Sequence, residues 1–432
     1  MNKKLLYLFI LAFCALSGTA QTYVSGGIYA NTNWTVSGSP YIVTGDLVLF
    51  PNFTLTIEPG VVVKFNDGIG FEVRGNLISN GTVADSILFI SSSSQPTPGI
   101  WNGIFISNNV GGQGSFRYTV VRYSDQGIWN ECCRETDTLF VRNSLFERNL
   151  TALGGYGGDY AKMVVDSCSF LHNDKTIIYG DKVIRNSAFI YNNYGLYNTE
   201  RTSVFSSNFC GNRTAILGTW GQMVNTIVMN NGIGVMGSIY GDFYINTGNV
   251  IANNDTGVIL KEGYIGANNV ICNNNYFNLV SATSQNMTII NQCWCDTDSA
   301  NIAAKILDGR DNPQLGLVDF VPYLNCDGSA VPDTNICPQI PAGISPPFLS
   351  TKLLIKNYPN PFKTFTTIEF DYQTGENYNL TIYNSLGQPC IALPHLTSGL
   401  VKIGRAGLPK GFYYCTLQSD TRMMATLKIV IE

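Results

Sequence analysis

The sequence contains NSLFERNLTAL at residues 143–153 and NSAFIYNNYGL at residues 186–196. In both segments an asparagine follows the phenylalanine by three residues, and a small residue and an aliphatic residue follow it by six and seven. The same arrangement recurs along the chain at spacings of 19 to 25 residues. A period near twenty indicates one supersecondary unit per repeat, which is too small to bury its own apolar face. Neighbouring units must therefore stack on one another.

Eight units align when the large apolar residue is taken as position zero. Position zero is Val121, Phe146, Phe170, Phe189, Phe209, Val228, Ile251 and Ile271. Position three is Ser124, Asn149, Asn173, Asn192, Asn212, Asn231, Asn254 and Asn274. Position six is Gly127, Ala152, Thr176, Gly195, Ala215, Gly234, Gly257 and Phe277, and position seven is Ile128, Leu153, Ile177, Leu196, Ile216, Val235, Val258 and Asn278. The eighth unit departs at positions six and seven, as terminal repeats commonly do.

This pattern predicts a stack of coils with like residues in columns. Positions zero and seven are expected to face inward, and the small residue at position six suits a tight turn. An asparagine at each corner can bond the turn backbone and the asparagine of the next coil. Each such hydrogen bond contributes about 1 kcal/mol net, but a continuous ladder of them fixes the register of the coils.

Two solenoid classes have this period. Leucine-rich repeats also carry an asparagine ladder, but their Leu-x-x-Leu-x-Leu-x-x-Asn consensus and helical half are missing here. The Asn-x-x-Gly-aliphatic rhythm resembles the right-handed parallel β-helix superfamily, and PGIWNGIFI at 98–106 is similar to the opening coils of its secreted bacterial members. The resemblance implies an all-β solenoid. About a dozen coils would give a rod on the order of 60 Å long, with a cap at each open end.

Charge and the N-terminal segment bear on location and partners. The formal net charge is −4 and the pI is about 5.3, so there is no basic footprint for nucleic acid. Lys3 and Lys4 precede an apolar run at 5–16 and small residues at 18–20, which predicts a signal peptide over residues 1–20. No later apolar run is long enough for a transmembrane segment. We expect an exported protein without a membrane anchor.

The chain changes character after the repeats. Residues 21–326 are expected to form the β-helix with its caps, and the Pro- and Ser-containing residues 327–350 a linker. Residues 351–432 show period-2 strands separated by Gly, Asn and Pro, which predicts a small Ig-like antiparallel β-sandwich.

Motifs in this last domain resemble a known family. The residues concerned are Tyr358, Pro359, Asn360, Pro361, Phe362, Gly387, Gly411 and Lys428. Their order is similar to the type A C-terminal sorting domain of type IX secretion in Bacteroidota. The resemblance implies that the type IX secretion machinery is a partner and that the protein reaches the outer-membrane surface or is released. The alternative is an ordinary Ig-like binding module.

Eleven cysteines remain beyond the signal peptide, and export makes disulfides permissible. Cys293, Cys295, Cys326 and Cys337 cluster where the repeats end and are candidate staples of a cap, with the connectivity open. Cys390 and Cys415 are candidates for a pair in the last domain. A metal site starting at Cys293 and Cys295 is the alternative, but no histidine lies nearby, so we predict no metal.

No catalytic signature stands out. Glycoside hydrolysis needs two carboxylates across the scissile bond, and lyases need a base beside a cation or metal. The two histidines, His172 and His395, fall in no such arrangement. We therefore expect a carbohydrate-binding or adhesion module without catalytic residues or cofactors. The alternative is a polysaccharide lyase or glycoside hydrolase.

Two places are candidates for polysaccharide binding. The first two clear repeats are the longest, and their excess forms two loops that carry Glu131, Asp137, Tyr156 and Asp159, suited to a sugar or to calcium. The second is position two on four successive coils, which is occupied by Tyr123, Arg148, His172 and Tyr191. The plainer alternatives are solvated loops and an outer corner without a partner.

Overall fold

The computed structural model describes residues 21–131, 138–155, 162–199, 201–218, 220–237, 243–261, 263–327, 329, 331–332, 355–370, 372, 378–384, 389–405, 407–419 and 425–432. These residues form two compact units, a solenoid and a C-terminal unit. The predicted signal peptide and most of the predicted linker lie outside the described residues. The four predicted domain boundaries therefore stay predictions.

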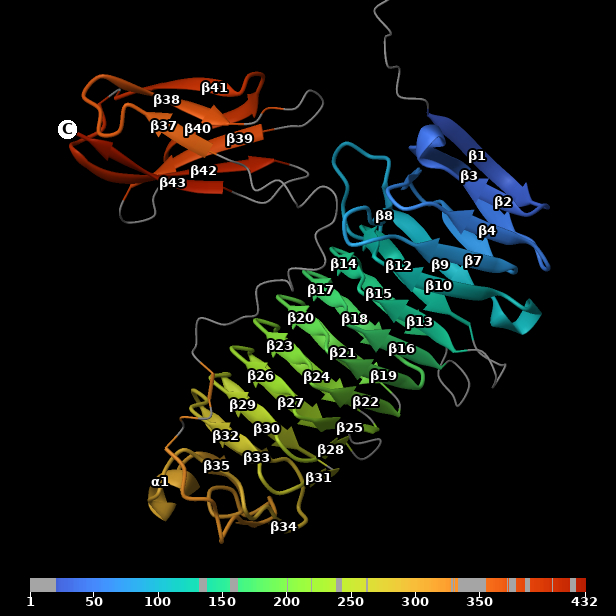
Figure 1. Cartoon of the computed structure of the whole chain (residues 1–432). Coiled ribbons are helices and arrows are strands. Elements are labelled where there is room, and N and C mark those ends of the chain that lie inside the picture. The colour runs from blue at the N-terminus through green and yellow to red at the C-terminus, as the bar shows by residue number, and fades with distance from the viewer. Residues whose placement is uncertain are drawn as a thin grey trace, which may run out of the picture. The chain divides into compact units, whose positions relative to one another are not determined.

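Three strand ladders run along the solenoid unit, and we call them faces one, two and three (Figure 1). Face one contains β5 (Val62–Phe65), β8 (Ile87–Ser91), β11 (Thr119–Arg122), β14 (Leu145–Glu147), β17 (Ser169–Leu171), β20 (Ala188–Ile190), β23 (Asn208–Cys210), β26 (Ile227–Met229), β29 (Val250–Ala252) and β32 (Val270–Cys272). Face two contains β6 (Gly70–Val73), β9 (Trp101–Ile106), β12 (Ser124–Asn130), β15 (Thr151–Gly155), β18 (Lys175–Ile178), β21 (Tyr194–Thr199), β24 (Thr214–Gly218), β27 (Ile233–Gly237), β30 (Thr256–Leu260), β33 (Phe277–Ser281) and β35 (Ile306–Leu307). Face three contains β2 (Thr32–Trp34), β4 (Thr54–Ile57), β7 (Asn76–Asn80), β10 (Gln113–Arg117), β13 (Leu139–Arg142), β16 (Met163–Asp166), β19 (Lys182–Arg185), β22 (Thr202–Phe205), β25 (Gly221–Val224), β28 (Phe243–Ile245) and β31 (Gly263–Ile265). At the N-terminal end, β1 (Thr22–Ile28) and β3 (Tyr41–Leu49) each join faces one and two.

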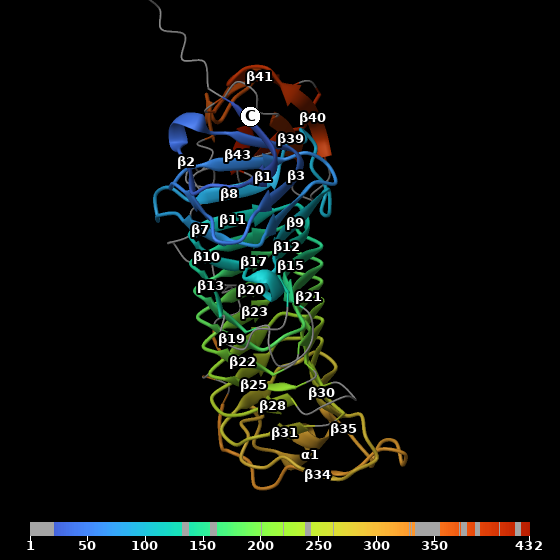
Figure 2. The same cartoon turned by 90° about the vertical axis from the view of Figure 1, so that its right-hand side faces the viewer.

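Every strand of these ladders pairs in parallel with the equivalent strand of the next coil, for example Phe146 with Phe170 and Phe170 with Phe189. Face three has eleven strands, so the solenoid has about eleven turns (Figure 2). The predicted parallel solenoid is confirmed. Leucine-rich repeats are excluded because the coils of the described repeats contain strands where that class has helices.

The predicted inward columns are also confirmed. All eight residues at position zero are fully buried, and so are the aliphatic residues at position seven of the first seven units. The four phenylalanines form a stack inside face one, with ring centroids 5.2, 4.7 and 4.4 Å apart from Phe146 to Phe209. Side chains that repeat on every coil thus bury one another, which a single unit cannot do.

The eighth unit departs from the pattern because it contains one extra residue. Thr256 pairs with Phe277 and Val258 with Leu279, so Leu279 occupies the place of the earlier aliphatic residues. Asn278 is buried and accepts a hydrogen bond from the Nδ2 of Asn274 at 3.0 Å. The insertion therefore supplies an amide that ends the asparagine ladder.

Two disulfides staple the C-terminal end of the solenoid. Backbone bridges join Val270 to Cys293 and Cys293 to Leu324, so two irregular layers continue face one beyond β32. Cys272–Cys295 and Cys293–Cys326 link these layers in sequence. Cys293, Cys295 and Cys326 were predicted as staples, Cys272 was missed, and Cys337 lies outside the described residues. The cap also contains α1 (Ser299–Ala303) and the short pair β34 (Met287–Thr288) and β36 (Val318–Asp319).

The C-terminal unit consists of two antiparallel sheets around one core. Tyr378, Leu380 and Ile368 are fully buried in it. One sheet contains β37 (Ile355–Tyr358), β38 (Phe365–Phe370) and β41 (Leu400–Gly404). The other contains β40 (Pro389–Leu396), β39 (Tyr378–Tyr383), β42 (Gly411–Ser419) and β43 (Ala425–Ile431) in that order. The predicted antiparallel sandwich is confirmed.

The predicted bond between Cys390 and Cys415 is wrong. Cys415 is a buried free thiol on β42, opposite Ile382 of β39. Cys390 lies on β40, at the other side of β39. Strands two places apart are separated by about 10 Å, whereas a disulfide needs Cα atoms within about 7 Å.

Candidate ligand-binding site

The turn between face one and face two, which we call the first corner, has one conformation in every repeat. Position two has a left-handed backbone in all eight units. The φ angles are 62° at Tyr123, 56° at Arg148, 54° at His172, 54° at Tyr191, 68° at Gly211, 58° at Asn230, 56° at Asn253 and 54° at Asn273. A left-handed residue reverses the chain sharply enough to start face two within a few residues. Asn and Gly adopt this conformation readily, while other side chains resist it.

The buried asparagine ladder follows at position three. In a typical step, the Oδ1 of Asn212 accepts from the backbone N–H of Asn192 at 2.9 Å and from its Nδ2 at 3.0 Å. The Nδ2 of Asn212 donates in turn to Asn231 Oδ1 and to the Phe189 carbonyl, both at 2.9 Å. Ser124 begins this ladder and Asn278 ends it. The ladder holds position two of each coil directly above position two of the next.

The ladder brings together the four residues predicted at position two, which we call the edge row: Tyr123, Arg148, His172 and Tyr191. Arg148 Nη1 donates to Tyr123 Oη at 3.0 Å. The rings of His172 and Tyr191 stack with centroids 5.7 Å apart and planes 10° apart. A Cβ at Gly211 would lie 2.4 Å from the Tyr191 ring, so the ring rests against this glycine. The edge row therefore runs over four coils, and the absence of a side chain at Gly211 leaves space for the Tyr191 ring.

The stacking decides which groups the edge row offers to a ligand. One face of the Tyr191 ring is against His172, and the other side is against Gly211. The side chain is nevertheless 53% exposed. The ring edges, the hydroxyl groups, the imidazole and the guanidinium are thus the accessible groups. These are hydrogen-bonding groups rather than open aromatic platforms.

Electrostatics make the edge row sensitive to pH. Screening of the imidazole from water lowers the pKa of His172 below its usual value, the Arg148 guanidinium lowers it further, and Glu147 acts in the opposite direction. Glu147 is itself paired with Arg122, with 2.8 Å between Oε2 and Nε. The imidazole is therefore mostly neutral at neutral pH, and the edge row gains positive charge in mild acid.

A hollow of about 580 Å³ continues the edge row beyond Tyr191. It opens where position two shrinks from Tyr191 to Gly211, Asn230 and Asn253. Its lining is polar and includes Asn193, Arg213, Asp255 and Asn275. The Nδ2 of Asn253 is buried and has no hydrogen-bond partner in the described part of the chain. Along the first corner, the side chains of the edge row thus occupy four coils, and the polar hollow occupies the coils that follow.

The predicted loop site is described only in part. Asp137, Tyr156 and Asp159 lie outside the described residues, so their place in any sugar or calcium site stays a prediction. Glu131 is described and partly buried, and its backbone N–H donates to the Ile106 carbonyl at 3.0 Å. Within the described part of the chain, one group of three possible metal ligands occurs, Cys293, Cys295 and Cys326, and all three sulfurs are in disulfides.

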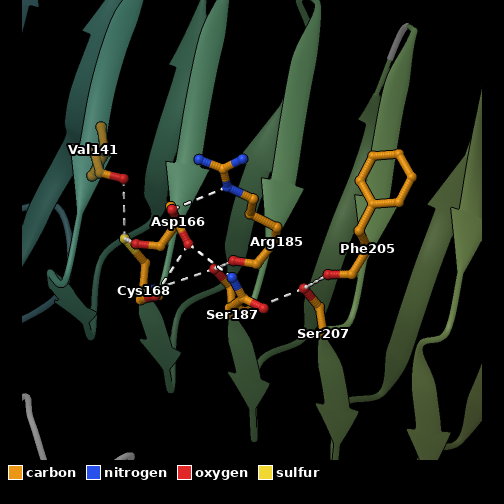
Figure 3. Close-up of polar contacts among 9 residues, drawn as sticks. Val141, Asp166, Cys168, Arg185, Ser187, Phe205 and Ser207 are labelled. Carbon is orange, nitrogen blue, oxygen red and sulfur yellow. Dashed lines mark hydrogen bonds and ion pairs between the residues drawn. The ribbon is translucent and has the colours of Figure 1, made fainter.

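Sequence reasoning missed a second buried ladder, at the turn between face three and face one, which we call the second corner. It lies two residues before position zero and contains Thr119, Ser144, Cys168, Ser187, Ser207, Thr226, Asn249 and Asn269, with Gln292 at its end. The backbone N–H of Cys168 donates to Ser187 Oγ at 3.1 Å, and that of Ser187 donates to Ser207 Oγ at 3.2 Å (Figure 3). The sequence pattern that marks this ladder is a small residue with a polar atom two residues before position zero. It is hard to recognise because the residue type changes from coil to coil.

The predicted sorting motif ties the last strand to the rest of the C-terminal unit. The Oδ1 of Asn360 accepts from the Val430 N–H at 2.8 Å. The N–H of buried Phe362 donates to the Val430 carbonyl at 3.0 Å, and the N–H of Glu432 donates to the Phe362 carbonyl at 2.9 Å. Gly411 begins β42, and the backbone of Lys428 on β43 pairs with Tyr414. Gly387 lies outside the described residues.

Residues 356–432 match the family model of the secretion system C-terminal sorting domain. The C-terminal unit is a sorting domain of this family. The protein is therefore exported by type IX secretion to the cell surface or beyond, and its sorting domain implies contact with that machinery. The assignment to Bacteroidota follows from the same domain. No helix among the described residues has the length and apolar character needed to cross a membrane.

A search of curated proteins found a short similarity to Protein bark beetle of Drosophila melanogaster. The identity is 34% over 59 residues, which is 14% of this chain and 2% of that protein. The chain thus spans a very small part of the length of this relative. The similarity carries no conclusion about function.

Proposed function

We propose that the solenoid binds extracellular polysaccharide along the first corner, with the edge row as the main contact surface. The observation that carries the proposal is the choice of side chains at position two. Tyr, Arg, His and Tyr occupy a left-handed position in four coils, where the same chain uses Gly or Asn in the next four. A left-handed conformation costs such residues on the order of 1 kcal/mol each, and strained residues of this kind concentrate at functional sites.

The second corner provides an internal comparison. Its left-handed residues are Tyr118, Asn143, Ser167, Asn186, Ser206, Asn225, Gly248 and Asn268. Apart from Tyr118 they are small residues, so the fold itself does not require bulky residues at such a turn. The run of four bulky residues at the first corner is therefore best explained by contacts outside the chain.

The chemistry of the edge row favours a hydroxylated polymer. The edge row presents a guanidinium, an imidazole and the Tyr191 phenol on exposed side chains, while Tyr123 is partly buried against the core. A polar hollow follows the edge row. Coils rise about 4.8 Å each, so four coils span roughly 15 Å, which is on the scale of a few sugar units. Arg148 and protonated His172 would add affinity for acidic polysaccharides.

The test is a variant that should be more stable and yet bind less. In the double variant Arg148→Asn/His172→Asn, asparagine relieves backbone strain by up to about 1 kcal/mol per site. We expect an equal or higher midpoint of thermal unfolding and at least about tenfold weaker binding to the acidic members of a panel of acidic and neutral polysaccharides. Tyr118→Asn is the matched control, because it relieves the same strain at the second corner and should leave binding unchanged.

Unchanged binding in the double variant would refute the proposal, and so would the lack of any polysaccharide bound by the wild-type protein. The same panel, assayed for reducing ends and unsaturated products, tests the enzymatic alternative. Turnover that Asp137→Ala or Asp159→Ala abolishes would place the function in the loops.

A further inference from the structure

A second cleft lies at the turn between face two and face three, which we call the third corner. It has a volume of about 450 Å³, within the range of about 300 to 1,000 Å³ of small-molecule sites. The ends of β9 and β12 form one side, through Ile106 and Asn130. The starts of β10 and β13 form the other, through Gln113 and Phe140. Asn108, in the 3₁₀ turn η2 (Asn108–Val110), closes one end.

One amide in this cleft lacks a partner. Asn130 is fully buried, and its Oδ1 accepts a hydrogen bond from Asn108 Nδ2 at 2.7 Å. Its own Nδ2 donates to no atom of the described residues. A buried donor left unsatisfied costs on the order of 1–3 kcal/mol, so such groups call for an explanation. A ligand acceptor in the cleft would satisfy this amide.

The lining indicates the kind of acceptor. The described lining residues carry amides, hydroxyls and one aromatic ring, and none of them is charged: Asn76, Ile106, Asn108, Gln113, Gly114, Ser115, Asn130, Thr138, Leu139 and Phe140. Phe140 is 38% exposed on the rim, and the Arg142 guanidinium lies over one face of its ring, 4.6 Å from the centroid, so a sugar ring can pack against the remaining ring surface. An ionic ligand would find no counter-charge among these residues, whereas a neutral hydroxylated ligand matches their donors and acceptors.

We propose that this cleft, which we call the Asn130 cleft, binds a neutral sugar unit, with the Asn130 Nδ2 donating to a hydroxyl or carbonyl oxygen of the ligand. The site is separate from the edge row, which carries the basic groups. The proposed function is thereby extended to a second subsite with a different ligand preference. Neither site depends on the other for its geometry, since they lie at different corners of the coils.

The test is calorimetric titration of the mature full-length chain with cello-, manno-, xylo- and N-acetylchito-tetraose, and with a galacturonic acid trimer. We expect at least one neutral oligosaccharide to bind, with about five- to tenfold weaker binding in Asn130→Ala and in Phe140→Ala. Phe140 is on the surface, so the second variant reports on binding even where the first fails to fold.

Two controls separate this proposal from the edge row. Ser169→Ala removes another buried polar atom that has no partner among the described residues, lies outside both sites and should not change binding of the neutral sugar. Arg148→Asn/His172→Asn should also leave it unchanged. The proposal is overturned by no binding of any neutral tetraose, or by binding that survives both Asn130→Ala and Phe140→Ala. Loss of neutral binding in the edge-row variant alone would assign the ligand to the first corner instead.

Discussion

Replacing the buried Asn212 by alanine should destabilise the solenoid far more than replacing a partly exposed asparagine of the same coil. The change removes the acceptor that the Asn192 backbone N–H has among the described residues, and one acceptor of the Asn192 amide. It also removes the bonds that Asn212 Nδ2 donates to Asn231 and Phe189. Water cannot easily replace these partners, because Asn212 is only 1% exposed.

The size of the effect follows from this count. An orphaned buried backbone N–H costs about 1–3 kcal/mol, and each further lost bond costs about 1 kcal/mol. The sum for Asn212→Ala is about 4–6 kcal/mol. Asn208→Ala in β23 is the matched control, because Asn208 is partly exposed and its side chain forms no hydrogen bond with the described residues, so its cost should stay within about 0.5 kcal/mol.

Urea unfolding followed by tryptophan fluorescence and far-ultraviolet circular dichroism measures both variants. Coils contact only their neighbours, so a weakened interface should also separate the two signals into distinct transitions for Asn212→Ala. A loss below about 1 kcal/mol, or one equal to that of Asn208→Ala, would refute the ladder as the element that holds the coils in register.

Three further predictions concern a thiol, the cap and the edge row. Burial raises the pKa of the Cys168 thiol to about 12, so a thiol reagent should label this thiol only after unfolding. The stability that the neutral thiol contributes should be complete below about pH 9 and should fall as the pH rises toward 12. In Cys168→Ser this dependence of the unfolding free energy on pH should disappear. Peptide mapping without reduction should recover the disulfides Cys272–Cys295 and Cys293–Cys326, and a Cys293–Cys295 disulfide would contradict the layered cap. Reduction should lower the free energy of unfolding by about 3 kcal/mol per disulfide. Binding of acidic polysaccharide should strengthen as the pH falls below about 6.5, because the lowered pKa of His172 places its proton uptake there, and the dependence should flatten in His172→Asn.

The repeat made the core and the first ladder predictable. Phe146, Phe170 and Phe189 recur with a single period, and a residue that repeats on every coil must occupy one column. The second ladder was harder to find because Ser144, Cys168 and Thr226 fill one structural role with different side chains. Backbone N–H groups there need only a small acceptor, so the sequence is free to vary.

The site was less predictable than the fold. Alignment placed Tyr123, Arg148, His172 and Tyr191 in one row, but it could not show that their rings stack on one another. Nor does a single sequence reveal a left-handed backbone at Arg148 or Tyr191, since these residue types rarely adopt it. The Asn130 cleft depends on the meeting of strands from three coils, which periodicity alone does not specify.

The contacts of Asn360 and Phe362 with the last strand have a consequence for biosynthesis. Asn360 and its partner Val430 are 70 residues apart in the chain, so the motif is synthesised well before the strand that it bonds. A chain cut before Val430 would leave the Asn360 side chain and the Phe362 backbone without these partners. We expect such a truncated chain to be exported poorly, because the motif and the last strand fold as one structure.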